Sequence, residues 1–117
     1  MDENIILEKC LKFTVRMLKL AAYLHNERQH VIADQIFRSG SSIGANIAES
    51  EYAATTPDFI NKIKIAEKEA SETAYWLRVL LTGDIIDQKQ FDSLYEDVQE
   101  LRRLIGSSLR TLKSKKL

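Results

Sequence analysis

The chain has little of what interrupts or cross-links a protein: one cysteine, one proline and four glycines among 117 residues. Because turns draw on glycine and proline, this shortage leaves room for few connections and excludes an all-β fold. The lone Cys10 excludes an internal disulfide framework and a thiolate zinc site, and it fits a reducing compartment. The acidic start Met1-Asp2-Glu3 has the wrong charge for a secretory signal, and no apolar run is long enough to cross a bilayer. We therefore expect a cytoplasmic protein that does not enter a membrane.

Net charge is also missing, since 17 Lys and Arg residues balance 17 Asp and Glu residues. Any attraction to nucleic acid must therefore come from how the charges are arranged. The chain does have 44% hydrophobic residues and enough length to build a core without disulfides or metal. No linker-like stretch divides it, so we expect a single domain over residues 1–117.

Four segments carry apolar residues at steps of three and four, the spacing of one face of an α-helix. They cover residues 3–28, 32–54, 56–83 and 87–112. Thr56-Pro57-Asp58 predicts the start of the third helix, Gly83 suits a left-handed position at its end, and Asp87 with Gln90 resembles a capping box. The inward residues expected on the first helix are Leu7, Cys10, Leu11, Thr14, Met17, Leu18, Ala21 and Leu24. Those expected on the fourth are Phe91, Leu94, Val98, Leu101, Ile105, Ser108 and Leu112.

Helices of similar length with short connections favour an all-α fold, an antiparallel up-down-up-down four-helix bundle. Small residues recur every four positions on two of the helices, which permits close approach of the backbones. They are Gly40, Gly44 and Ala48 on the second helix and Ala66, Ala70 and Ala74 on the third. We interpret these stripes as tight packing within one bundle, with a subunit contact as the alternative.

Two sequence patterns suggest catalysis or metal binding, and neither is complete. Gly40-Ser41-Ser42-Ile43-Gly44 matches a nucleophile elbow, but that elbow needs a strand before it, and here it lies inside a helical pattern. Glu27 and His30 have the spacing of a di-iron ligand pair, but the second pair that such a site requires is missing. We therefore expect no catalytic residue, no metal and no cofactor, and we do not expect an enzyme.

Glu49 and Glu72 each follow a run of small or apolar residues. A carboxylate in such a place needs hydrogen-bond partners, for which Ser41, Ser42, Asn46 and Ser71 are candidates. We interpret the two carboxylates as parts of a structural polar network. Acid-base catalysis is the alternative, but it lacks a suitably placed histidine or lysine.

Basic residues gather on the first helix and at the end of the fourth. Lys9, Lys12, Arg16 and Lys19 fall within an arc of roughly 80° around a helix, and residues 102–117 contain basic but no acidic side chains. In an antiparallel bundle the first and fourth helices are neighbours, so the two groups would merge into a nucleic-acid surface. Its expected residues are Lys9, Lys12, Arg16, Lys19, Arg103, Arg110 and Lys113. Solvation, together with the favourable place of cations at a helix end, is the structural alternative.

The string from Ser41 to Glu49, preceded by Ala33 to Ser39, resembles the signature of a bacterial family. These are the four-helix-bundle proteins encoded in intervening sequences of 23S rRNA genes, often called S23-like, and they are related to the accessory variability proteins of diversity-generating retroelements. The likeness extends to Asp58-Phe59 and to Ala70-Ser71-Glu72, whereas Ser50 stands where the family often has glycine.

The resemblance implies a homopentameric ring without known enzymatic activity, and its retroelement relatives bind a reverse transcriptase and nucleic acid through basic surfaces. By the same resemblance, some positions would be structural or interface positions: Ser41, Ser42, Ile43, Asn46, Ile47, Glu49, Ser71 and Glu72. We therefore expect an oligomeric adaptor that associates with RNA or DNA, together with a nucleic-acid-processing partner protein. The alternative is a structural oligomer or protein-interaction module that does not contact nucleic acid.

Overall fold

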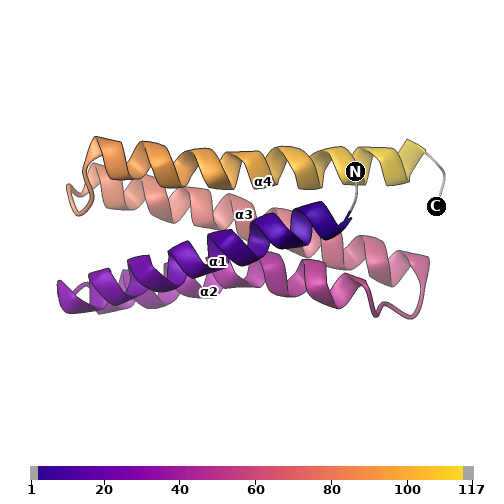
Figure 1. Cartoon of the computed structure of the whole chain (residues 1–117), viewed down its shortest axis with the longest axis horizontal. Coiled ribbons are helices and arrows are strands. Elements are labelled where there is room, and N and C mark those ends of the chain that lie inside the picture. Colours follow the sequence, from indigo (N-terminus) through magenta and orange to yellow (C-terminus); the bar gives the residue numbers. More distant parts are fainter. Residues whose placement is uncertain (1–2, 115–117) are drawn as a thin grey trace.

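The computed structural model describes residues 3–114, and the side chains of residues 5–112. They form four helices, α1 (Glu3–Asn26), α2 (His30–Ser50), α3 (Thr56–Thr82) and α4 (Gln88–Ser114). The helices alternate in direction along an elongated bundle of 46 × 22 × 19 Å, so that α1 begins and α4 ends at the same end (Figure 1). The expected all-α up-down bundle is confirmed. Over the described residues, no helix is both long enough and apolar enough to cross a membrane.

The three connections are short, and local hydrogen bonds define them. Thr55 caps α3, since its hydroxyl accepts from the Asp58 backbone N–H at 3.2 Å. A reciprocal capping box begins α4, where the Gln90 N–H donates to the Asp87 carboxylate at 2.7 Å and the Gln90 side chain accepts from the Asp87 N–H at 2.9 Å. The left-handed residue after α3 is Asp84, with φ 58°, and not Gly83 as the sequence predicted. Gly83 is still the residue at which α3 ends: it follows the last helical residue, Thr82, and its N–H makes a final helical bond to the Val79 carbonyl.

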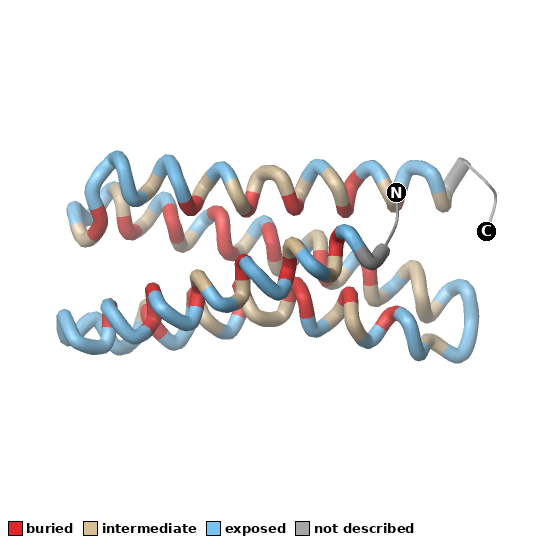
Figure 2. Tube along the Cα trace, in the orientation of Figure 1, coloured by how far each residue is buried: buried red, intermediate tan, exposed pale blue. Residues whose placement is uncertain are grey.

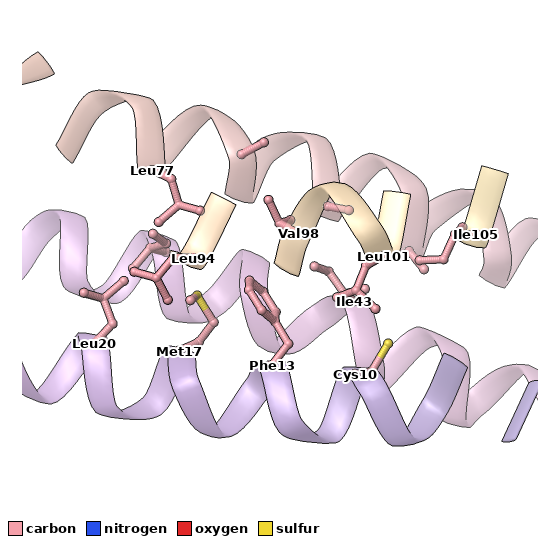
Figure 3. Close-up of a cluster of buried hydrophobic side chains, with 14 of the residues drawn as sticks. Cys10, Phe13, Met17, Leu20, Ile43, Leu77, Leu94, Val98, Leu101 and Ile105 are labelled. Carbon is pink, nitrogen blue, oxygen red and sulfur yellow. The ribbon is translucent and has the colours of Figure 1, made fainter. Parts of the chain in front are cut away.

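The buried residues lie on the inner sides of all four helices (Figure 2). Figure 3 shows side chains of α1 meeting side chains of the other three helices in the middle of the bundle. On α4 the expected positions hold as far as Ile105, after which Leu109 is buried in place of Ser108. The step of four brings Leu109 onto the same side of the helix as Ile105 and Leu101.

The inward face of α1 differs from the prediction. The side chains buried there belong to Ile6, Cys10, Phe13, Met17, Leu20, Ala21 and Leu24. Leu11 and Leu18, which the periodicity predicted to be inside, are 61% and 57% exposed. Because α1 is apolar on two neighbouring sides, the spacing of its apolar residues fits two different inward faces. The face predicted from the sequence is turned partly away from the core.

The glycines of α2 lie where α1 packs most closely against it. A Cβ on Gly40 would come 2.6 Å from Cγ of Met17, and a Cβ on Gly44 would come 3.0 Å from Cβ of Cys10. A side chain at either position would have to displace α1. The alanine stripe of α3 is also buried in the bundle, which agrees with the interpretation of both stripes as internal packing.

The helices that follow one another in sequence make the broad contacts of the bundle, whereas α1 and α4 touch least. Toward the end of the bundle that holds the turn between α1 and α2, α1 diverges from α4 (Figure 1). A groove opens between them there, and its lining includes Leu20, Tyr23 and Ile86.

Candidate nucleic-acid interface

The serines of the Ser41–Glu49 string bond to the backbone of their own helix. The hydroxyl of Ser41 donates to the carbonyl of Phe37, and that of Ser42 donates to the carbonyl of Arg38, both at 2.6 Å. The side-chain amide of Asn46 donates to the Ser42 carbonyl at 2.8 Å. Ile43 and Ile47 are buried in the core. These contacts place the string within α2, without the preceding strand that a nucleophile elbow requires.

The two carboxylates that the sequence joined in one polar network have separate, charged partners on the opposite helix. Glu49 of α2 accepts from Nζ of Lys62 of α3 at 3.0 Å. Glu72 of α3 accepts from the guanidinium of Arg38, and from Nε1 of Trp76 at 2.9 Å. The hydrogen bond from Arg38, supported by that from Trp76, lowers the pKa of Glu72.

The expected serine partners of these carboxylates are therefore wrong. The Ser41 and Ser42 hydroxyls are used inside α2, and Ser71 is exposed on another side of α3. Both carboxylates instead form ion pairs between α2 and α3.

Two of the four basic residues of α1, Lys9 and Arg16, face α4, and both meet acidic residues there. Nζ of Lys9 lies 3.4 Å from the Glu100 carboxylate. The guanidinium of Arg16 lies 2.5 Å from the Asp97 carboxylate, and it also donates to Ser93. The other two basic residues of this group on α1 have different surroundings. Lys12 pairs with Glu8 of α1 itself at 3.8 Å, and Lys19 lines the groove between α1 and α4.

Arg103 and Arg110 lie on a different side of α4. They line a groove between α3 and α4 of about 520 Å³, and the expected merged surface with α1 does not form. The physical reason is rotation around the helix, because Asp97 and Glu100 point toward α1 while Arg103 and Arg110 are turned about 100° from them. The side chain of Lys113 lies outside the described residues.

The groove between α3 and α4, which we call the basic groove, is lined by five cationic side chains and one carboxylate. Its lining residues are Lys64, Glu67, Lys68, Ser71, Gln99, Arg102, Arg103, Gly106 and Arg110. The four cations other than Arg102 are exposed, and over residues 5–112 none of those four forms an ion pair within 4 Å. Arg102 donates to Oε1 of Gln99 at 2.7 Å.

Gly106 lies on the floor of the basic groove, and two side chains of the groove, Arg110 and Glu67, lie over it. Nη1 of Arg110 and Oε2 of Glu67 lie 3.4 and 3.6 Å from the place where a Cβ of Gly106 would be. Guanidinium groups match the geometry of phosphate oxygens, and lysine ammonium groups add point charges beside them. The arrangement can therefore bind a polyanion by its phosphates.

Sequence reasoning missed Lys64 and Lys68 and did not select Arg102. The signal was available: Lys64 and Lys68 are one turn apart on the third helix, and in an antiparallel bundle that helix is also a neighbour of the fourth. Comparing the angular positions of the cations with those of Asp97 and Glu100 would have directed Arg103 and Arg110 toward α3.

One further polar cluster occupies the turn between α1 and α2. Nδ1 of His25 lies 2.7 Å from Nδ1 of His30, and Nε2 of His25 lies 2.8 Å from the Asp34 carboxylate. His30 thus pairs with His25 and not with Glu27. Among the described residues, no group of three or more His, Cys, Asp or Glu side chains is placed to hold a metal ion.

The four helices and their up-down order place the chain in the class of antiparallel four-helix bundles. Within that class, residues 2–107 match the family described as 23S rRNA-intervening sequence proteins, and the chain belongs to this family.

A solved structure agrees with this assignment. It is the crystal structure of a protein of unknown function from the S23 ribosomal protein family of Bacteroides thetaiotaomicron, with 44% sequence identity and a TM-score of 0.90. The match covers 94% of this chain and 99% of that one. Among curated proteins, none matches this chain.

Proposed function

We propose that this protein is a non-enzymatic oligomeric adaptor that binds RNA or DNA through the phosphates held in the basic groove. The observation that carries the proposal is the concentration of five cations beside one carboxylate in a chain with no net charge. Such a local excess attracts a polyanion even where the whole molecule does not. The adaptor works in the cytoplasm, as the lone Cys10 suggests, and delivers nucleic acid to a partner protein that processes it.

The basic groove supports this function better than the basic residues of α1 do. Lys9 and Arg16 are already neutralised by Glu100 and Asp97, so binding a phosphate there would mean breaking an ion pair. Over residues 5–112, the exposed cations of the basic groove form no ion pair within 4 Å that a phosphate would have to break.

Binding in the basic groove is tested by charge reversal and a fluorescence anisotropy titration with labelled RNA at about 50 mM salt. The variant R103E/R110E should bind about tenfold or more weakly, and its logarithmic salt slope should fall by roughly 1.4 to 1.8, or 0.7 to 0.9 for each lost phosphate contact. The matched control K12E/K19E makes the same charge change on α1 and should lose much less affinity. Equal losses in the two variants, or no binding by the original protein, would refute the proposal.

Assembly is the second part of the proposal, and the exposed side of α1 supports it. Leu11, Val15 and Leu18 are 61%, 50% and 57% exposed, and they form one stripe along α1. We propose that a second copy of the chain covers this stripe, in the homopentameric ring that the resemblance to the S23-like and accessory variability proteins implies. A ring repeats the basic groove, so that several weak contacts act together on one nucleic acid.

The same apolar stripe favours the second candidate function, a structural oligomer or protein-interaction module that does not bind nucleic acid.

Native mass spectrometry tests the assembly. The original protein should exceed the mass of one 13.4 kDa chain, and L11E/L18E should fall to that mass. Val31 is 82% exposed and V31E, at the beginning of α2, should leave the mass unchanged. A single-chain mass for the original protein would refute the assembly, whereas an oligomer without RNA affinity would favour the second function.

A further inference from the structure

The outer face of α3 carries a row of polar and aromatic side chains that extends beyond the basic groove. Its members follow steps of four and three along the helix, and each of them is exposed. The row consists of Lys64, Lys68, Ser71, Tyr75, Arg78 and Thr82. The first three line the basic groove, and the last three line an adjoining depression of about 460 Å³. One helix face therefore joins a cationic groove to an aromatic site.

Tyr75 is the member of this row that phosphate binding does not explain. Its side chain is 57% exposed, although a large aromatic ring would gain free energy from burial. Its ring meets the indole of Trp76 edge-on, with the ring centroids 5.3 Å apart and the planes at 65°. A T-shaped contact covers at most one face of the Tyr75 ring, so at least one face remains available to a ligand.

The spacing of the row suits a nucleic-acid strand. With a rise of 1.5 Å per residue, Tyr75 lies about 10 Å along α3 from Lys68 and about 16 Å from Lys64. Arg78 follows Tyr75 by about 4.5 Å along the helix axis, and both side chains line the same depression. A short run of nucleotides can thus keep its phosphates at the lysines while a base reaches Tyr75.

We propose that the outer face of α3 binds single-stranded nucleic acid, with phosphates in the basic groove and an unpaired base stacked on Tyr75. This inference rests on the proposed phosphate binding in the same groove. Base pairs of a duplex are already stacked on one another, so a duplex presents its phosphates to the lysines but no free base face to Tyr75. Single strands of RNA and of DNA are therefore both ligands, and a duplex binds more weakly.

The experiment compares a labelled single-stranded oligonucleotide with a duplex of the same length by fluorescence anisotropy at one salt concentration. Y75A should bind the single strand roughly 5- to 140-fold more weakly, the range expected for loss of one stacked base. Y75F keeps the ring and should bind like the original protein. Duplex affinity should change less than twofold in both variants.

A second tyrosine provides the matched control. Tyr52 is 87% exposed and follows the end of α2, so Y52A removes an exposed ring outside the α3 row and should leave both affinities unchanged. Circular dichroism should show the same helix content in all these variants, because both tyrosines lie at the surface.

The outcomes separate this inference from the proposed function. If R103E/R110E loses affinity while Y75A binds the single strand normally, phosphate binding stands and the stacking site is wrong. Equal affinity of the original protein for single strand and duplex would overturn the single-strand preference. Absence of binding to either nucleic acid would overturn both proposals.

Discussion

Adding one methyl group at Gly44 tests the close packing of α1 on α2. In an α-helix, replacing glycine with alanine usually raises stability, by about 1 kcal/mol in the interior of a helix. At Gly44 the new Cβ would lie 3.0 Å from Cβ of Cys10 and 3.5 Å from Oγ1 of Thr14. The Cys10 Cβ is attached directly to the backbone and cannot swing aside, so α1 itself must move.

Overpacking of this kind costs about 1 to 3 kcal/mol. Set against the helix gain of about 1 kcal/mol, the free energy of unfolding of G44A should fall by about 0 to 2 kcal/mol. G44L, which puts three more carbon atoms into the same contact, should be less stable than G44A. Gly106 provides the control, since the nearest atom to its new Cβ would be Nη1 of Arg110 at 3.4 Å, the far end of a flexible side chain.

The assay is urea unfolding followed by circular dichroism, at one protein concentration for all variants. G106A should gain about 0.5 to 1 kcal/mol, so the two alanine variants should differ by about 0.5 to 3 kcal/mol. If G44A gains as much as G106A, or if G44L unfolds at the original urea concentration, α1 does not pack on Gly44 as described.

Three further predictions concern single side chains. T55A should lower the free energy of unfolding by about 1 kcal/mol in the same assay, because the Asp58 N–H loses its cap. Burial raises the pKa of the Cys10 thiol to about 12, so a thiol reagent at pH 8 should label it only as urea unfolds the chain; rapid labelling of the folded protein would contradict its burial. The hydrogen bond from Arg38 lowers the pKa of Glu72 in the folded state. The stability that this interaction contributes is therefore present above the ordinary glutamate pKa, and it is lost as the pH falls through the lowered pKa of Glu72. R38A should therefore move the acid midpoint of tryptophan fluorescence to higher pH, and an unmoved midpoint would show that this contact does not set the pKa.

Most of the fold could be predicted from the sequence because local signals agree with one another. Periodic apolar residues, the capping box at Asp87 and Gln90, and the proline at the start of the third helix each indicate the observed element. The inward side of α1 could not be predicted in the same way. Leu11 and Leu18 have the spacing of core residues, and only the packing of the other helices decides which of two apolar sides turns inward.

The candidate site depends on rotation and register, which periodicity alone does not fix. The sequence predicted that the first helix, with Lys9 and Arg16, lies beside the fourth. It did not predict the acidic partners Glu100 and Asp97, because their position depends on how α4 is rotated about its axis. The charged partners of Glu49 and Glu72, Lys62 and Arg38, lie on the opposite helix in each case, so reasoning along one helix selected nearby serines. Contacts between helices were therefore the part that needed three-dimensional structure.

The contact between α1 and α4 is the smallest between neighbouring helices, so we expect local unfolding to begin there. Ion pairs at the surface, Lys9 with Glu100 and Arg16 with Asp97, join the two helices, and such pairs weaken as salt rises. In native-state hydrogen exchange, local openings of low free energy occur where few buried contacts resist them. Backbone amides in the second half of α1, around Leu20, should thus exchange sooner than those in the middle of α3, and salt should widen the difference. We therefore expect α1 and α4 to separate locally while the α2–α3 pair, which makes the broadest contact, stays packed.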